Sequence, residues 1–351
     1  MKDFIKKINS LDYVKLTIFL DEVFHKSDKA TRSYLYFELK KSPYALLDKF
    51  LSRFSEVEEV RFRREMENLE EPDRIDYANG EERITYILKN LPEILKEAKT
   101  LNEANKEKLL QYRELIKSTE SYVYADQMLG KPAPSAFKPI PARDAEIIDL
   151  PQPDGSVIKK EQIFQLISDR CTTRDFTSEQ LTLSELSWLL WATQGVRKEV
   201  PAENRFYRTV PSGGDRHPFE TYLAINNVEG LKPGIYRFLS HENKLLYLKS
   251  VDEMEAQLTE IGIGQNYVGN CAVCFMWSAI PERTEWRYAN HAKKNILIEA
   301  GHLGQNLYLA TEAINCGTCG IAAYDQAKAD ELLELDGIDE FVVYMMPVGK
   351  T

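Results

Sequence analysis

The sequence predicts two folded parts: an all-helical N-terminal domain and a larger α+β domain in which helices flank a mixed sheet. Glycine divides the chain, because only Gly80 precedes residue 130 and the other sixteen of the 17 glycines follow. All four tryptophans also lie in the later part. Between Pro132 and Pro153 lie six of the 15 prolines, which is typical of a stiff, extended connector without regular structure.

These observations predict a helical domain over residues 1–130, a proline-rich linker over 131–153 and the α+β domain over 154–351. A length of 351 residues and a hydrophobic content of 43% allow a sizeable core. The net charge of −10 argues against sequence-independent binding of nucleic acid, which requires many phosphate contacts. The chain shows neither the run of roughly 20 apolar residues of a membrane helix nor the apolar core of a secretory signal, so we expect a cytoplasmic protein without membrane association.

Helical periodicity fills the first domain. One apolar face is formed by Tyr13, Leu16, Phe19, Leu20 and Val23. Further helical patterns run through residues 32–54, 82–98 and 102–117. Three prolines are expected to end or kink these helices: Pro43, Pro72 and Pro92. The charges of this domain are typical of solvated helix faces and indicate no chemistry.

In the later domain, helices and short strands alternate. Helices are expected at residues 162–168 and 183–196, and Thr182 with Glu185 three residues on indicates a capping box. Strands are expected, in order, at ETYLAINNV (220–228), at the hairpin of GIYRF and KLLYLKS, at VCFMWSAI, near 320–323, and at FVVYMMPVG near the end. A helix over 326–333 precedes the last strand.

The stretch from Asn295 to Asn315 is apolar on almost every face of a helix, which predicts a buried central helix. Gly301 and Gly304 each cost such a helix roughly 1 kcal/mol relative to alanine, a cost that is tolerated where another backbone or a flat ligand comes close. Polar residues such as Glu299 then need buried partners or an interface. The alternative is a core helix with no chemistry of its own.

The five cysteines are an odd number in an intracellular-looking chain, which argues against a disulfide framework. Cys271 and Cys274 have C-x-x-C spacing in an apolar strand, where residues three apart point to opposite faces and cannot share one ion. We therefore expect no metal site and interpret the cysteines as small buried hydrophobic residues.

Two segments carry residues suited to chemistry. In the first, Arg170, Thr172 and Arg174 alternate in an extended segment and so project on one side, a geometry suited to binding an anion such as a phosphate. The alternative is a surface arginine pair bridged to Asp169 or Asp175.

In the second segment, Gly213 and Gly214 allow a turn that presents backbone N–H groups to a ligand, and Ser212 adds a hydroxyl. His217 could exchange a proton near neutral pH. The alternative is a hydrogen-bonded histidine that orients the loop.

In order along the chain stand R-x-T-x-R-D-F, LLWATQG, R-T-V-P-S-G-G-x-R-H-P-x-E, GIYRF, EAGHLGQNLYLATEA and MPVG. In combination these motifs resemble the nitroreductase-fold flavoproteins, and most of all their SagB-type branch, which includes FMN-dependent dehydrogenases that oxidise azoline rings in modified peptides. The resemblance runs from about residue 140 to the C-terminus and leaves the helical first 130 residues outside it.

The resemblance implies which residues hold FMN. Arg170 would pair with the phosphate, while Thr172 and Arg174 would bind the ribityl chain or the pyrimidine edge, where a cation tunes the redox poise of the flavin. The turn of a second subunit would line the same flavin, and the remaining implied contacts are Pro211, Ser212, Gly213, Gly214, Gly320 and Lys350. The helix from Asn295 to Asn315 would lie at the homodimer interface.

The function implied by the resemblance is an FMN-dependent dehydrogenase that oxidises a peptide or other natural-product intermediate by hydride transfer to flavin N5. The catalytic candidates are Asp215, Arg216 and His217, with Asp215 or His217 handling the proton; His217 stands where many relatives have a tyrosine. Two alternatives remain: an NAD(P)H-dependent nitro or quinone reductase, and a flavin-free peptide- or protein-binding module. The helical domain is a candidate for recognising a leader peptide or a protein partner.

Overall fold

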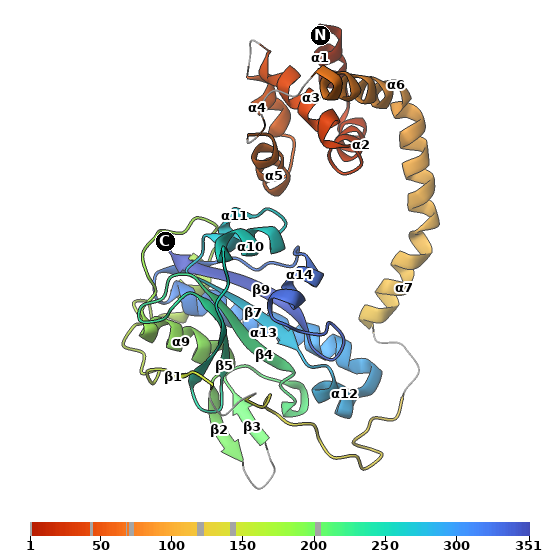
Figure 1. Cartoon of the computed structure of the whole chain (residues 1–351). Coiled ribbons are helices and arrows are strands. Elements are labelled where there is room, and N and C mark those ends of the chain that lie inside the picture. The colour runs from red at the N-terminus through yellow and green to blue at the C-terminus, as the bar shows by residue number, and fades with distance from the viewer. Residues whose placement is uncertain are drawn as a thin grey trace. The chain divides into compact units, whose positions relative to one another are not determined.

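The computed structural model describes residues 2–42, 45–67, 69, 74–117, 123–140, 145–200 and 205–351. The chain forms two compact units, Met1–Lys117 and Ser118–Thr351. Figure 1 shows that the first unit is helical and that helices flank a sheet in the second, which confirms the predicted fold class.

The first unit buries the apolar faces of its helices in one core. The helices described are α1 (Lys2–Asn9), α2 (Tyr13–Phe24), α3 (Lys29–Lys40), α4 (Leu46–Leu51), α5 (Glu56–Glu67), α6 (Arg74–Ala104) and α7 (Lys106–Lys117). Phe19, Leu35, Phe62, Ile84 and Ile87 are fully buried at the centre of this core. The helical periodicity of the sequence therefore reflects packing within the unit.

Two expectations for this unit are corrected. Tyr13 is 84% exposed, because it is the first residue of α2 and lies one turn before Leu16, where the buried face begins. Pro92 was expected to end or kink a helix; it lies inside α6, so the first of these expectations is wrong and a kink stays a prediction. A proline inside a helix costs about 3 kcal/mol, and burial of apolar residues such as Leu91 beside it offsets that cost. Pro43 and Pro72 lie outside the described residues.

The second unit is built on a seven-stranded sheet in the order β1-β6-β5-β4-β7-β9-β8. Its strands are β1 (Ile147–Asp149), β4 (Phe219–Ile225), β5 (Gly234–Leu239), β6 (Lys244–Lys249), β7 (Val273–Ala279), β8 (Cys316–Thr318) and β9 (Phe341–Lys350). All the pairings described in this sheet are antiparallel, where the sequence predicted a mixed sheet. A separate hairpin is formed by β2 (Val196–Val200) and β3 (Arg205–Arg208).

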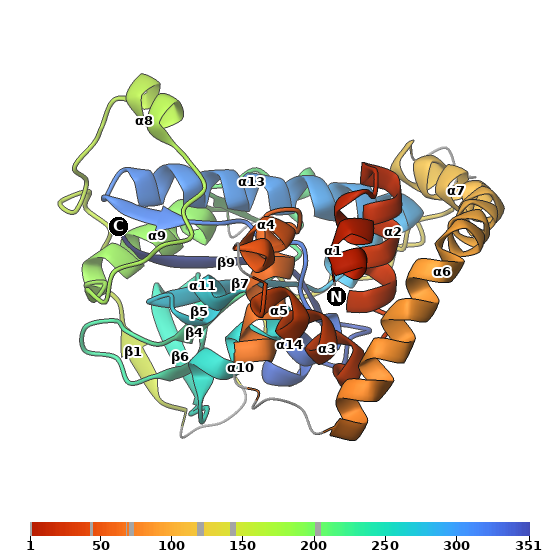
Figure 2. The same ribbon diagram turned by 90° about the horizontal axis from the view of Figure 1, so that it is seen from above.

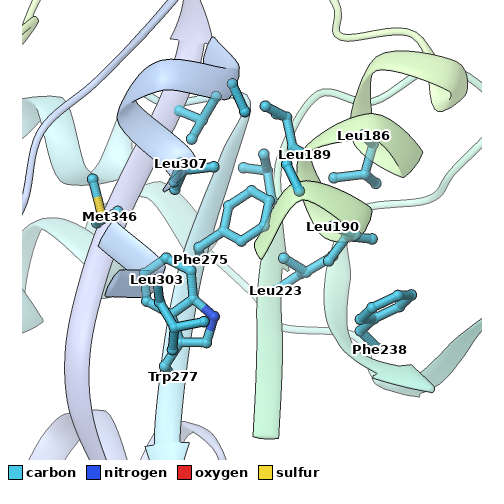
Figure 3. Close-up of a cluster of buried hydrophobic side chains, with 14 of the residues drawn as sticks. Leu186, Leu189, Leu190, Leu223, Phe238, Phe275, Trp277, Leu303, Leu307 and Met346 are labelled. Carbon is cyan, nitrogen blue, oxygen red and sulfur yellow. The ribbon is translucent and has the colours of Figure 1, made fainter. Parts of the chain in front are cut away.

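Helices cover both faces of this sheet (Figure 2). The helices of this unit are α8 (Ile163–Asp169), α9 (Leu183–Gln194), α10 (Met254–Ile261), α11 (Asn266–Gly269), α12 (Glu282–Tyr288), α13 (Ala292–Glu312) and α14 (Gln326–Leu332). Helix α8 buries no side chain and does not cover the sheet. Phe275 and Trp277 of β7 pack with α9 and α13, whereas Cys274 and Met276 pack with α10, α11 and α14 on the other face. Figure 3 shows the first of these cores, with Leu303 and Leu307 of α13 beside Phe275 and Trp277.

Of two local predictions for this unit, the capping box is confirmed and the position of a short strand is corrected. The capping box of α9 is present, because the Thr182 hydroxyl accepts the Glu185 N–H at 3.2 Å and the Glu185 carboxylate accepts the Thr182 N–H at 2.9 Å. The short strand expected near 320–323 lies earlier, at β8, and Ile321 makes only an isolated bridge with Met345.

The proline-rich stretch has neither helix nor strand over residues 131–140, as its composition predicts, but it also makes contacts with the sheet that the sequence did not predict. Its later part forms β1, which pairs with β6 at the edge of the sheet. Three buried arginines donate hydrogen bonds to its carbonyl groups: Arg283 to Ser135 O (3.0 Å), Arg208 to Ala136 O (3.5 Å) and Arg237 to Pro139 O (2.8 Å). Prolines lack an N–H group, so donors from elsewhere in the fold hold this segment. The boundaries at residues 130 and 153 stay predictions.

The two C-x-x-C cysteines at 271 and 274 do not point to opposite faces. Cys271 precedes β7, so the alternation of a strand does not apply to it. Both side chains are buried in the same core and contact one another. The hydrogen bond with Cys271, together with burial, raises the pKa of the Cys274 thiol.

Helix α13 is buried on one side and exposed on the other, where the sequence predicted burial all round. The buried side includes Glu299, Leu303 and Gly304, and the exposed side includes Leu297 and Ile298, which are 64% and 49% exposed. The two glycines therefore differ. A Cβ at Gly304 would lie 2.5 Å from the Tyr344 ring, whereas a Cβ at Gly301 would meet nothing within 4 Å.

We expect Gly304→Ala to lower the free energy of unfolding by about 1–3 kcal/mol, because the Tyr344 ring must shift. Gly301→Ala is the matched control, and within one subunit it should raise that free energy by up to about 1 kcal/mol through helix propensity. Urea unfolding of both variants measures the difference. Equal effects at the two positions would contradict the close approach of Tyr344.

Candidate functional site

Two residues of the first predicted segment, Arg170 and Thr172, contact Tyr308 of α13, and so does Gly320. We call these four residues the arginine cluster. The Arg170 guanidinium lies 5.2 Å from the centroid of the Tyr308 ring. Thr172 Oγ1 is 3.3 Å from the Tyr308 hydroxyl, and the Gly320 N–H donates to the same hydroxyl at 2.8 Å. Tyr308 therefore joins three of the predicted cofactor contacts, which lie far apart in the sequence.

Backbone hydrogen bonds place this segment along the ends of β8 and β9. The Thr173 N–H donates to Thr318 O at 3.0 Å, and the Thr177 N–H donates to Lys350 O at 2.9 Å. The Lys350 ammonium itself pairs with Glu185 at 2.5 Å. Burial opposes the charge of Lys350, but the hydrogen bond and charge of Glu185 outweigh it and raise the pKa of Lys350. The predicted phosphate contact of Lys350 would therefore compete with Glu185.

The two arginines of the segment contact different rings. Arg174 lies over Tyr267 of α11, 5.7 Å from its centroid, so Arg170 and Arg174 do not share one contact as a regular alternation would suggest. Asp169, the expected ion-pair partner, lies 3.5 Å from Lys160 instead. Among the residues that the structure describes, no carboxylate forms a salt bridge with Arg170. Its half-buried guanidinium is thus available to an anion.

The second segment forms a strained turn between β3 and β4, which we call the glycine turn (residues 211–217). Gly214 has φ = +60°, and Asp215 and His217 also have positive φ angles of 54° and 47°. Non-glycine residues adopt this conformation rarely, so surrounding contacts must hold it. They are Gly213 N–H to Glu299 Oε1 (2.8 Å), His217 N–H to Ser212 Oγ (2.8 Å), Arg283 to His217 O (3.3 Å) and Arg205 Nε to Asp215 Oδ2 (2.7 Å).

Three N–H groups of the turn are bonded within the chain, and presentation of the Gly214 N–H to a ligand stays a prediction. The Gly213 N–H is bonded to Glu299 of α13. The N–H groups of Asp215 and Arg216 donate to Ser212 O and Gly213 O, at 3.2 and 3.3 Å, because the turn closes into a short 3-10 helix, η2 (Gly213–Asp215). These three donors are therefore turned inward, and Pro211 at the start of the turn is exposed.

The three catalytic candidates are all engaged in contacts of the turn. His217 is 5% exposed, with Nε2 2.7 Å from Phe206 O. Burial, together with the positive charge of Arg208, lowers the pKa of His217 to about 3. Asp215 is paired with Arg205, and Arg216 lies over Trp286, 4.8 Å from the centroid of the ring. This geometry favours the loop-orienting alternative for His217, and a catalytic role for any of the three stays a prediction.

The buried neutral histidine makes stability depend on pH. A folded pKa of about 3 lies below the unfolded value of about 6.5, so His217 contributes stability above pH 6.5 that is lost as the pH falls toward 3. The loss is of order 3–5 kcal/mol when complete. In His217→Gln, unfolding measured against pH should lack this acid-sensitive component. An unchanged acid slope would show that His217 is not the group responsible.

Sequence reasoning missed three residues at these sites. Tyr308 lies in the EAGHLGQNLYLATEA motif but was given no role, and Tyr288 lies in no motif. Only tertiary packing brings Tyr308 beneath Arg170 and the Tyr288 ring to within 3.5 Å of a Cβ at Gly213. Glu299 was noted only as a polar residue needing a partner. Burial raises the pKa of Glu299 to about 7, although hydrogen bonds from Gly213 and Ser212 and the charge of Arg208 oppose the shift.

The arginine cluster and the glycine turn contact different parts of α13. Glu299 holds the turn, and Tyr308 stands nine residues further along. At 1.5 Å per residue the two contact points are about 14 Å apart along the helix axis. Within one chain, the glycine turn and the arginine cluster therefore contact α13 at two separate points.

A family model for the nitroreductase family matches residues 167–350, a span that includes both the arginine cluster and the glycine turn. This chain belongs to the nitroreductase family. Members of that family are generally flavin oxidoreductases and usually bind FMN. The match confirms the nitroreductase family that the sequence motifs indicated. The SagB-type branch stays a prediction.

Two curated relatives share part of the chain of this nitroreductase-family protein. MJ1384 of Methanocaldococcus jannaschii, named as a nitroreductase, is 28% identical over 205 residues, which cover 58% of this chain and 98% of MJ1384. The trifolitoxin operon protein TfxC of Rhizobium leguminosarum bv. trifolii is 26% identical over 195 residues. That match covers 52% of this chain, which spans about half (54%) of TfxC.

A solved structure from Ralstonia eutropha JMP134, also named as a nitroreductase, has a TM-score of 0.49 and 22% identity. It covers 63% of this chain, and the match spans 99% of that structure. Across the described parts of this nitroreductase-family chain, no helix is long and apolar enough to cross a membrane.

Proposed function

We propose that this protein is an FMN-dependent oxidoreductase, a SagB-type dehydrogenase that oxidises a peptide or another natural-product intermediate. The observation that carries the proposal is the arginine cluster: in a chain of the nitroreductase family, Arg170 and Thr172 meet the Gly320 amide around Tyr308. The match to MJ1384, which covers 98% of a protein named as a nitroreductase, supports the proposal.

The residues present fit an anionic coenzyme. Arg170 is a half-buried cation whose charge no described carboxylate neutralises, and a guanidinium binds phosphate with charge-assisted hydrogen bonds. Thr172 contacts the same Tyr308 as Arg170, and both Thr172 and Arg174 are exposed, so polar edges of a ligand can reach them. FMN, when bound, supplies an N5 atom that accepts a hydride. The chain would bind its phosphate with Arg170 and hold its polar edge with Thr172 and Arg174.

A homodimer would complete this site. One side of α13 exposes Leu297 and Ile298 around Gly301, and α8 exposes Ile163, Phe164 and Ile167 at 60%, 83% and 60%. Contiguous exposed apolar side chains mark interaction surfaces. We infer that a second copy packed on α13 would bring its glycine turn to the arginine cluster of the first, whereas within one chain their contact points on α13 are about 14 Å apart.

The proposed substrate class rests on the motif resemblance and on one relative. TfxC is named as a protein of the trifolitoxin operon. That name is consistent with a substrate that is an intermediate of natural-product biosynthesis. A nitro or quinone reductase that uses NAD(P)H is the second candidate, because the match to MJ1384 covers 98% of a protein named as a nitroreductase.

Two measurements separate these functions. The purified protein should show the visible absorbance of flavin and release FMN on denaturation, and a colourless protein that takes up no FMN would instead favour the flavin-free binding module. Stopped-flow mixing of the FMN-loaded protein with NADPH should give no rapid bleaching for a dehydrogenase. Rapid reduction would favour the NAD(P)H-dependent reductase.

A further inference from the structure

Glu299 lies where α13 meets the glycine turn, and its carboxyl is 6% exposed. One oxygen, Oε1, accepts the Gly213 N–H at 2.8 Å. The Ser212 hydroxyl also hydrogen bonds to the carboxyl, and it accepts the His217 N–H at 2.8 Å. A single side chain of α13 thus contacts two successive residues of a turn that contains three positive φ angles.

We propose that Glu299 is the positioning residue of the glycine turn: its carboxyl fixes Gly213 and Ser212 on α13, more firmly when protonated than when ionised. This inference rests on the proposed function only where it concerns flavin, because the turn would border the flavin of the partner subunit. The hydrogen bonds of Glu299 with Gly213 and Ser212 are present in the chain without any ligand.

The hold depends on the proton because the carboxyl is buried. Burial raises the pKa of Glu299 to about 7, and the hydrogen bonds of Gly213 and Ser212 with the charge of Arg208 only partly oppose this. If the turn lifts from α13, water reaches the carboxyl and its pKa returns toward the model value of 4.5. A pKa that is higher in the closed state means that closure is favoured below pH 4.5 and weakens as the pH rises to about 7.

The charged groups that face Glu299 do not titrate in this window. Arg208 of β3 is buried, and burial lowers its pKa only to about 10, so it stays positive. His217 of the turn has its pKa lowered to about 3 by burial, so it stays neutral. Arg283 of α12 bonds to the carbonyl of His217 and is held by Glu220 at 2.7 Å. The remaining neighbours of Gly213 are Asn295 and the Tyr288 ring.

Amide hydrogen exchange of the ligand-free protein tests the hold directly. After correction for the intrinsic exchange rate, the opening equilibrium of the Gly213 amide should rise by up to roughly tenfold per pH unit between about pH 5 and 7. Glu299→Gln keeps a carbonyl that accepts the Gly213 N–H but cannot ionise, so its opening should not change with pH. Glu312 is the other carboxylate of α13, and the Glu312→Gln variant should behave like the wild type. Opening that is independent of pH in the wild type, or equally dependent on pH in Glu299→Gln, would overturn the proposal.

Flavin binding provides a second readout. The ratio of the FMN dissociation constants of the wild type and Glu299→Gln, measured by quenching of flavin fluorescence, should rise as the pH increases from about 5 to 8. Taking the ratio cancels the ionisation of the FMN phosphate. A constant ratio would overturn the role of Glu299 at the flavin. Failure of the wild type to bind FMN at any pH would overturn the proposed function, and the exchange experiment would still decide the role of Glu299.

Discussion

Leu297→Glu is expected to convert the proposed homodimer into a monomer that no longer holds the proposed FMN. Leu297 is 64% exposed on α13, where a second copy would bury it. A carboxylate forced into an apolar interface loses its hydration without gaining a partner, which costs several kcal/mol. Without the second copy, the arginine cluster would lack the glycine turn that borders the flavin. Sedimentation equilibrium measures the mass, and absorbance of the same sample measures bound FMN.

Leu101→Glu is the matched control, because Leu101 of α6 is a leucine with nearly the same exposure, 62%. It should leave both the dimer and the flavin unchanged. A Leu297→Glu protein that remains dimeric would show that α13 is not the interface. A monomer that keeps its full FMN would show that one chain suffices for the site.

Arg170→Ala is expected to weaken FMN binding by about 10- to 100-fold, because a hydrogen bond to a charged group contributes roughly 1.5–3 kcal/mol. The fold should be unaffected, since the Arg170 side chain lies on the ring of Tyr308 and forms no salt bridge with a described carboxylate. Fluorescence titration of the apoprotein with FMN measures the change, and riboflavin, which lacks the phosphate, should bind both proteins alike.

Two further variants sharpen the assignment. Arg170→Lys keeps the charge but not the planar fork, so its affinity should fall between those of the wild type and Arg170→Ala. Arg53→Ala, an exposed arginine of the first unit, should bind FMN as the wild type does. Wild-type affinity in Arg170→Ala would place the phosphate elsewhere, and an equal loss for riboflavin would show that Arg170 acts on the ring system.

Most of the elements could be predicted because their signals are local. The capping box at Thr182, the hairpin of β5 and β6 and the apolar run of β7 each depend on residues within a few positions of one another. Strand β1 and the contacts of the proline-rich stretch were not predicted, because their partners, such as Arg237 and Arg283, lie far along the chain. The six motifs from R-x-T-x-R-D-F to MPVG indicated the family only in combination, and the match over residues 167–350 confirms it.

The sequence by itself determined the fold class, the membership of a flavoprotein family and the two segments that could bind an anion and form a turn. Tertiary structure alone decided how those segments act. It turned the Gly213 N–H toward Glu299, buried His217 so that it stays neutral, and exposed Leu297 on a helix whose composition predicts burial. The physical reason is that periodicity and capping act over a few residues, whereas desolvation, charge and hydrogen-bond partners depend on side chains that only the folded chain brings together.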